Sequence, residues 1–432
     1  MESPPPFVLR NVALPSGRTA DITTENGRVT HVGSSVASLG GTDCRGLMVL
    51  PAAVDMHVHM RGGAQSGKED WESGSKSALA GGVTVVVDQP NTLPPLNAPD
   101  VFLRRVQDAK DHSWCNFAVN SAVSGDVPFE AMWEAGAIVF GETFFAPSSY
   151  GDAVSDEALW LALNRIRALG GPGSPGGIAT IHAEEIGPGP DTGMGSHDDS
   201  RSPAGEIRAV AAVGRLNPGG CRLHFCHLSS AGSVAAAARA GASSPVTIEV
   251  TPHHLFLSRD LFEDSDPRGK VNPPIRSENV RKDLAACWDR IDVIASDHAP
   301  HTKAEKSQAF SDAPSGVPGV ETMVPLLLAR VLEGKISLAS VIEKTSLSPA
   351  AILGIPRAGF SVGDRADFAI YSREPCRITA DRLHSRCGWT PFEGMPAVFP
   401  GLVVMGGCVV YRDGEFSHGQ PSWFPGRGYV SR

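Results

Sequence analysis

The sequence lacks the features of a secreted, membrane-spanning or disulfide-stabilised protein. Its 432 residues include only eight cysteines, dispersed from Cys44 to Cys408, which do not form the dense framework of small secreted domains. No uninterrupted apolar run approaches the roughly 20 residues of a membrane-spanning helix, and no cationic start followed by an apolar stretch precedes Phe7. We therefore expect reduced, mostly buried thiols and a soluble, cytoplasmic protein without a membrane partner.

Clusters of basic residues are also missing. Lysine and arginine are scattered, and the formal net charge is -9 with a sequence pI of about 5.9. A nucleic-acid-binding domain usually presents a basic patch to the phosphate backbone, so we expect no nucleic acid as a partner. Lysine is absent altogether between Lys110 and Lys270. A lysine side chain can therefore take no part in a site built from that stretch of the chain.

From residue 48 onward, short apolar or β-branched runs alternate with Ala/Leu-rich stretches of helical character. This alternation is typical of repeated βα units in a parallel sheet. The runs are Met48 to Val58, Thr84 to Asp88, Asn116 to Val123, Ala137 to Glu142, Ile178 to Glu184, Arg222 to Leu228, Thr247 to Thr251 and Asp292 to Ser296. Eight such strands predict an α/β protein with a TIM (β/α)8 barrel, whose catalytic groups lie at the carboxyl ends of the strands.

The two ends of the chain have a different sequence pattern, with short strand-like runs and tight turns such as Glu25-Asn26-Gly27. We predict that residues 1–50 and 359–432 together form one small β-rich domain and that residues 51–358 form the catalytic barrel. Two Gly/Pro/Asp-rich loops, 187–205 and 302–319, follow the fifth and eighth strands on the side of the catalytic rim. They are either lids and substrate contacts or simple surface insertions.

Residues that can bind a metal occur where several of these strands end. His57 and His59 alternate along the first strand and therefore point to one face, and such a pair suits Zn²⁺. Alone, the pair could equally be a core or surface feature. His182, His227 and Asp297, however, end the fifth, sixth and eighth strands at the same rim. Four histidines and one aspartate at one rim predict a metal centre.

Five motifs extend this pattern over nearly the whole chain: Asp55-Met56-His57-Val58-His59, Ile181-His182-Ala183-Glu184, Cys226-His227-Leu228-Ser229, Thr251-Pro252-His253-His254 and Ser296-Asp297-His298-Ala299-Pro300-His301-Thr302. Together they resemble the amidohydrolase superfamily. Further motifs resemble the dihydroorotases among its cyclic amidases: Met60-Arg61, Lys68-Glu69-Asp70, Gln89-Pro90-Asn91-Thr92 and Lys270-Val271-Asn272-Pro273-Pro274-Ile275-Arg276.

The resemblance implies reversible hydrolysis of dihydroorotate to N-carbamoyl-aspartate, a step of de novo pyrimidine biosynthesis, at a site with two Zn²⁺ ions per chain. Asp297 would place one carboxylate oxygen on a metal, and the other could take a proton from the attacking water and pass it to the leaving nitrogen. His253, His254 and His298 are expected to support the ligands or to pack in the core.

Dihydroorotate differs from hydantoins and allantoin in carrying a ring carboxylate. Arg61, two residues beyond His59 on the same face, could pair with it, together with Asn91 and His301. Arg61 could also be a surface residue, and Asn91 could be only a turn former. The resemblance assigns Asn272 to the ring amide, and it adds substrate contacts from Pro318 and Gly319.

The sequence departs from the superfamily at the end of the fourth strand, where many members bridge two metals with a carboxylated lysine. Glu142 stands there instead, and some dihydroorotases resemble this chain in having an acidic residue near this point. We predict that Glu142 is a metal ligand and bridges the two ions. The alternative is that it pairs with a nearby basic group while a single metal occupies the site.

Two other functions remain open from the sequence. A hydantoinase or allantoinase would share the metal ligands but not Arg61, Asn91 and Asn272. A catalytically silent scaffold, for instance beside aspartate carbamoyltransferase, would usually have lost ligands that this chain retains. The sequence leaves open whether the protein forms a homo-oligomer or a complex with aspartate carbamoyltransferase.

Overall fold

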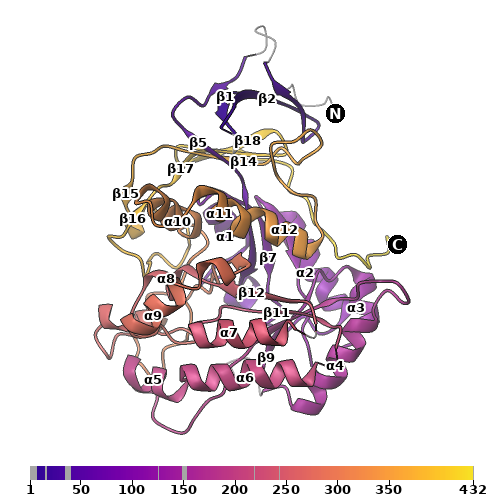
Figure 1. Ribbon diagram of the computed structural model, residues 1–432, viewed down its shortest axis with the longest axis vertical. Helices are drawn as coiled ribbons and strands as arrows, with labels where there is room; N and C mark the ends of the chain where they lie inside the picture. Colours follow the sequence, from indigo (N-terminus) through magenta and orange to yellow (C-terminus); the bar gives the residue numbers. More distant parts are fainter. Residues whose placement is uncertain are drawn as a thin grey trace.

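The computed structural model describes residues 7–14, 17–34, 40–124, 126–147, 153–217, 219–242 and 244–431. Figure 1 shows two layers of β-structure at one end of a larger body, in which helices surround a set of strands. Within the described ranges, the helices are too short or too polar to cross a bilayer.

The larger body contains eight strands that pair only in parallel, in the orders β6-β7-β8 and β13-β12-β11-β10-β9. Their bounds are β6 (Ala53–Val58), β7 (Val83–Asp88), β8 (Asn116–Val119), β9 (Phe140–Phe144), β10 (Ile178–His182), β11 (Arg222–Phe225), β12 (Val246–Val250) and β13 (Val293–Ile294). Parallel bridges from Ser121 to Phe140 and from Val58 to His298 connect the two groups of strands at both edges. All the carboxyl ends of these strands therefore lie on the same side.

Helices connect the parallel strands and lie around them (Figure 1). They are α1 (Trp71–Ala80), α2 (Pro99–His112), α3 (Phe129–Ala135), α4 (Asp156–Ala168), α5 (Met194–Ser200), α6 (Pro203–Leu216), α7 (Ala231–Ala240), α8 (Pro252–Phe256), α9 (Glu278–Ala285), α10 (Met323–Leu332), α11 (Leu338–Ile342) and α12 (Ser348–Leu353), with one π-helical turn at Glu343–Leu347. Short 3-10 turns occupy Gly63–Gln65, Arg259–Leu261, Pro267–Gly269, Trp288–Arg290, Glu305–Ser307 and Ala380–Arg382. Several helices begin at a side-chain cap, such as Asp70 for α1 and Ser230 for α7.

Two further sheets are built from the two ends of the chain. One has the order β3-β2-β1-β4 and the other β19-β18-β17-β14-β5. Their strands are β1 (Phe7–Ala13), β2 (Thr19–Glu25), β3 (Arg28–Gly33), β4 (Thr42–Asp43), β5 (Met48–Pro51), β14 (Phe368–Tyr371), β17 (Pro400–Met405), β18 (Cys408–Arg412) and β19 (Glu415–Phe416), with a separate pair β15 (Cys376–Arg377) and β16 (Pro396–Ala397). The antiparallel pairing of β5 with β14 joins the two ends of the chain in one sheet. Asn26 and Gly27 form the expected tight turn, with φ of 51° and 73°.

The predicted runs differ from the observed strands, for instance by four residues at the end of β8 (Asn116–Val119), and two of the differences affect how the site is built. The run Met48 to Val58 is not one strand, because the chain changes partner near Ala52: its amide donates to Asp367, whereas the Ala53 amide donates to Gly82. Pro51, which has no N–H, ends β5 just before this change. The fourth parallel strand begins at Phe140 rather than Ala137, and Glu142 therefore lies within the strand.

An apolar cluster fills the interior near the amino ends of the parallel strands. It includes Val54, Val85, Ile178 and Val293, and Phe424 from the C-terminal segment packs against it. This cluster leaves the carboxyl ends as the place where polar side chains can meet.

Candidate metal centre and substrate cavity

Six predicted metal ligands meet at the carboxyl ends of the parallel strands. They come from β6 and the residue after it, β9, β10 and the turns after β11 and β13: His57, His59, Glu142, His182, His227 and Asp297. All are at least nine-tenths buried. The donor atoms of His57, Glu142 and His227, and those of His57, His59 and Asp297, lie within 4.8 Å of one another in each group.

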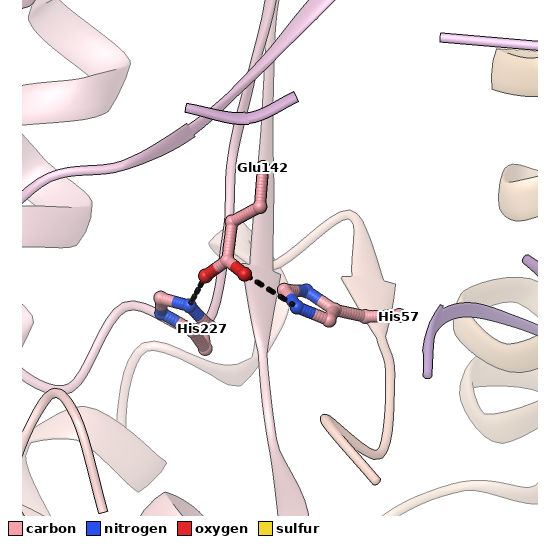
Figure 2. A group of neighbouring side chains, drawn as sticks. All are labelled: His57, Glu142 and His227. Carbon is pink, nitrogen blue, oxygen red and sulfur yellow. Dashed lines mark hydrogen bonds and ion pairs between the residues drawn. The ribbon is translucent and has the colours of Figure 1, made fainter. Parts of the chain in front are cut away.

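The carboxylate of Glu142 lies between two groups of histidines. Its Oε1 is 3.0 Å from His182 Nδ1 and 2.8 Å from His227 Nε2, whereas its Oε2 is 3.5 Å from His57 Nε2. Figure 2 shows the two oxygens directed toward different rings, one to His227 and one to His57. Asp297 Oδ1 completes the second group, 3.5 Å from His57 Nε2 and 3.3 Å from His59 Nε2.

The donor set fits a divalent cation such as Zn²⁺, which takes imidazole and carboxylate ligands. His57 Nε2 is buried and has no hydrogen-bond partner, although two carboxylates face it. A buried nitrogen without a partner is costly, and a cation between His57 and the carboxylates would satisfy it.

The local backbone is unusual at the residues that carry these groups. His227 and Asp297 adopt φ of 35° and 46°, a left-handed conformation that non-glycine residues rarely occupy outside turns and functional sites. Gly141, beside Glu142, has φ of 125°, and a Cβ there would lie 2.2 Å from the Thr180 carbonyl oxygen. Only glycine therefore lets β9 approach β10 closely enough to place Glu142 among the histidines.

Three of the four histidines are held by a second polar group through their other ring nitrogen. His57 Nδ1 lies 3.1 Å from Glu249, His59 Nδ1 lies 2.9 Å from Asn91 Oδ1, and His182 Nε2 lies 2.6 Å from Glu184. Such contacts fix the ring orientation and the tautomer of a metal-binding histidine. Sequence reasoning missed Glu249 and Glu184, and it assigned Asn91 only to the substrate.

The charged groups of the cluster favour the binding of a cation. Burial would raise the pKa of Glu142, but the charge of His57 and hydrogen bonds from His182 and His227 hold it well below its usual range. Burial would lower the pKa of His182, but Glu142 and Glu184 raise it to about 9. Without a cation, this cluster therefore holds protons that metal binding must displace.

A cavity opens beside the metal cluster. Its lining combines metal ligands with residues predicted to bind substrate: His59, Arg61, Asn91, Glu142, Phe144, His182, Asn272, Asp297, Ala299, Ser315 and Gly316. Arg61 is only 4% exposed, so its guanidinium adds a buried positive charge to the cavity. Phe144, Ala299, Ser315 and Gly316 were not predicted from the sequence.

The other predicted substrate residues, His301, Pro318 and Gly319, are buried and do not line this cavity. His301 is buried behind Arg61, with its Nε2 3.0 Å from the Ser315 carbonyl and its Nδ1 3.2 Å from Lys68 Nζ. Pro318 and Gly319 are also buried, and the Gly319 amide donates to His298 Nδ1. In loop 302–319, Ser315 and Gly316 are the residues that reach the cavity, a contact that sequence patterns do not reveal.

Comparisons with known proteins agree with this geometry. The chain is 40% identical to a dihydroorotase of Halobacterium salinarum over 420 residues, covering 94% of this chain and 97% of that protein. It is 38% identical to a dihydroorotase of Methanosarcina acetivorans, covering 95% and 91% of the two chains. No protein-family model matches the chain.

Among solved structures, an L-hydantoinase (dihydropyrimidinase) from Arthrobacter aurescens superposes with a TM-score of 0.89 at 27% identity, covering 96% of this chain and 99% of that one. A dihydropyrimidinase from Brevibacillus agri shares the fold, with a TM-score of 0.86 at 22% identity over 99% of this chain and all of that one. The fold and the buried cluster of histidines and carboxylates thus define a metal-dependent cyclic amidohydrolase. Within that class, the chain belongs to the dihydroorotase family.

Proposed function

We propose that this protein catalyses the reversible hydrolysis of (S)-dihydroorotate to N-carbamoyl-L-aspartate in de novo pyrimidine biosynthesis. The observation that carries the proposal is the position of Arg61, whose buried guanidinium lines the same cavity as the metal cluster. A guanidinium binds a carboxylate through two parallel hydrogen bonds. Dihydroorotate carries a ring carboxylate, whereas hydantoin and dihydrouracil do not.

The polar groups around Arg61 support the same substrate. Asn91 accepts from His59 through Oδ1, which leaves its amide hydrogens for an acceptor in the cavity. Asn272 lies across the cavity, with its Oδ1 3.2 Å from Ser315 Oγ, where an amide of the substrate ring could bind. We assign His301, Pro318 and Gly319 to supporting this side of the cavity.

We further propose that the chain holds two Zn²⁺ ions. His57, His59 and Asp297 would bind one, His182 and His227 the other, and Glu142 would give one carboxylate oxygen to each. Two cations a few Å apart repel strongly, and an anion between them reduces the repulsion. The ions would polarise the scissile carbonyl and make water a better nucleophile. No carboxylated lysine is needed, in keeping with the lack of lysine between Lys110 and Lys270.

In this proposal Asp297 is the general base. It contacts His57 and His59 through Oδ1, so Oδ2 can take a proton from the attacking water. In the hydrolytic direction, the same oxygen returns the proton to the ring nitrogen as the carbon–nitrogen bond breaks. Arg61 and Asn91 would hold the ring carboxylate during this transfer, so that the carbonyl stays in line with the attacking water.

We also infer the architecture that the sequence predicts. The eight parallel strands and the two bridges that connect their edges support a (β/α)8 barrel within residues 51–358. The pairing of β5 with β14 supports a small β-rich domain from residues 1–50 and 359–432.

Steady-state hydrolysis of a substrate panel tests the proposed function. Metal-loaded protein should hydrolyse dihydroorotate far faster than hydantoin, dihydrouracil or allantoin, and it should form dihydroorotate from N-carbamoyl-aspartate. Metal-stripped protein is the control for metal dependence. Similar rates on the uncharged rings would favour a hydantoinase, and no turnover by protein with full metal content would favour a scaffold.

A further inference from the structure

Strand β12 contributes none of the six proposed ligands, yet it carries a completely buried carboxylate, that of Glu249. The neighbouring strands β11 and β13 each lead directly to a ligand, His227 and Asp297. Removing a carboxylate from water is strongly unfavourable unless other groups compensate for the lost hydration. The contacts of Glu249 therefore indicate why an acid occupies this position.

Both oxygens of Glu249 are engaged, and two of the three contacts lead to proposed ligands. Oε1 lies 3.1 Å from His57 Nδ1 and accepts the backbone amide of His227 at 3.0 Å. Oε2 lies 3.0 Å from His224 Nε2, and the other nitrogen of that ring is 2.8 Å from Thr247 Oγ1. One carboxylate thus contacts the side chain of one ligand and the backbone of another.

These contacts have different consequences for the two histidines. Because a carboxylate only accepts, His57 Nδ1 carries a hydrogen, so Nε2, which faces Glu142 and Asp297, is the nitrogen that would bind a metal. The amide of His227 belongs to a residue with φ of 35°, a conformation that needs support from its surroundings. By accepting this amide, Glu249 helps to hold the turn that aims His227 Nε2 at Glu142.

We propose that Glu249 is a shared positioning residue for both metal ions, acting through the ring of His57 at one and the backbone of His227 at the other. This inference rests on the proposed division of the ligands between two ions. His224 holds the second oxygen of Glu249 and so keeps the carboxylate in place.

Glu184 provides a contrast within the same chain. It contacts His182 Nε2 at 2.6 Å and is itself held by Arg201 Nη1 at 2.5 Å. Its contact with a proposed ligand is through one ring only. Replacing Glu184 should therefore weaken the binding of one metal ion, whereas replacing Glu249 should weaken the binding of both.

The test measures metal affinity without substrate, on the full chain reconstituted with Zn²⁺ or Co²⁺. Glu249→Gln keeps the shape of the side chain and removes its charge. Glu184→Gln makes the same change at the carboxylate that contacts only one proposed ligand. Glu321→Gln is the matched control, because Glu321 is a buried carboxylate paired with His384, which is not a proposed ligand. Chelator competition gives both dissociation constants, and the visible spectrum of bound Co²⁺ reports ligand geometry.

We expect Glu249→Gln to weaken both binding steps by about 10-fold to 100-fold, the usual effect of losing such a supporting carboxylate, and to change the Co²⁺ spectrum. Glu184→Gln should weaken one step, and Glu321→Gln neither. Unchanged affinities in Glu249→Gln, or a change in one step alone, would overturn the proposal. These outcomes do not depend on whether dihydroorotate is the substrate, which the substrate panel decides separately.

A second variant covers the case in which Glu249→Gln does not fold, as judged by circular dichroism and thermal melting. His224→Gln leaves Glu249 in place and frees its Oε2. Both ions should therefore bind more weakly than in the parent protein, but the loss of affinity should be smaller than the one expected for Glu249→Gln. If His224→Gln folds and binds both ions as the parent protein does, the shared role of Glu249 is wrong.

Discussion

The metal side and the substrate side of the cavity are built differently. The metal side uses residues in or directly after parallel strands, and His57, His59 and His182 are each held by a second polar group. The substrate side uses Arg61, Asn272 and residues 315–316, which lie in loops. Strands fix side chains more rigidly than loops do. Changes on the metal side should therefore act on kcat, and changes on the substrate side mainly on KM.

The substrate loop nevertheless has anchors of its own. Lys306 is 3% exposed, and its ammonium group donates to the carbonyl oxygens of Lys270, Pro314 and Gly316. The indole of Trp389, in the C-terminal segment, donates to the His301 carbonyl at 2.7 Å. Residues far beyond the last parallel strand thus help to shape the side that recognises substrate.

Asp297→Asn should have the largest effect, because it removes the proposed base on the metal side. The amide cannot take a proton from water, so kcat should fall by about 10²-fold to 10⁴-fold, with a further loss if the metal is bound less well. The fold and part of the metal should remain, as shown by circular dichroism and elemental analysis.

Asp283→Asn, on the exposed side of α9, is the control that removes the same charge away from the site. It should leave kcat unchanged. If Asp297→Asn kept most of its activity, the base would be another group, and His301 would be examined first.

Glu142→Ala should have the next largest effect, since it removes the proposed bridge. Metal content should fall from about two ions per chain toward about one, and kcat should fall with it. Reconstitution of the parent apoprotein should not depend on bicarbonate, because no lysine carbamate has to form. Elemental analysis with Glu72→Ala, on α1, as the surface control checks both points. Full metal content and near-normal turnover in Glu142→Ala would show that Glu142 does not bridge the ions.

Arg61→Met tests the substrate side and should act mainly on KM. A hydrogen bond to a charged group contributes about 1.5–3 kcal/mol, so KM for dihydroorotate should rise roughly 10-fold to 100-fold. Some loss of kcat would follow if the contact also orients the ring. Metal content should stay normal, which separates this variant from those on the metal side. An unchanged kcat/KM would remove Arg61 from the site.

The same contrast explains what the sequence could reveal. The alternation of His57 and His59 and the strand-end positions of His182, His227 and Asp297 follow from regular strand geometry. The structure brings these residues together, with Glu142 joining His182 to the others. The family interpretation is confirmed by the relatives. Ser315 and Gly316 were not foreseen, because the path of a long loop depends on tertiary contacts.

Glu249 illustrates a signal that was present but not used. A single acid within the run Val246–Val250 is out of place in a strand that must be buried on both faces. The β5–β6 break was missed for the opposite reason, since apolar residues continue through Pro51 and Ala52 while only the pairing partner changes. Periodicity reports burial well, but it does not report which strand lies alongside.

The smallest expected effect is a difference in how the two sides respond to pH. Burial lowers the pKa of His301 far below its usual range, and the charges of Arg61, Lys68 and Lys306 lower it further. His301 should therefore stay neutral between pH 6 and 8 and add no acid limb to KM. Burial lowers the pKa of Lys306 to about 7, so KM for dihydroorotate should rise modestly as pH increases through this range, because Lys306 loses the proton with which it holds residues 314 and 316 of the substrate loop.

The metal side should respond differently. Burial would raise the pKa of Asp297, but His57, His59 and His227 hold it below its usual range, so the base is ionised at high pH and is lost as pH falls. In the hydrolytic direction, kcat should therefore fall on the acid side by about tenfold per pH unit below the apparent pKa of Asp297 and the water it activates. Initial rates of metal-loaded protein, measured at several pH values, give the pH dependence of kcat for the metal side and of KM for the substrate side. His301→Asn is the matched variant. An acid limb in KM that disappears in His301→Asn would show that His301 titrates, and a flat kcat would contradict the role of Asp297.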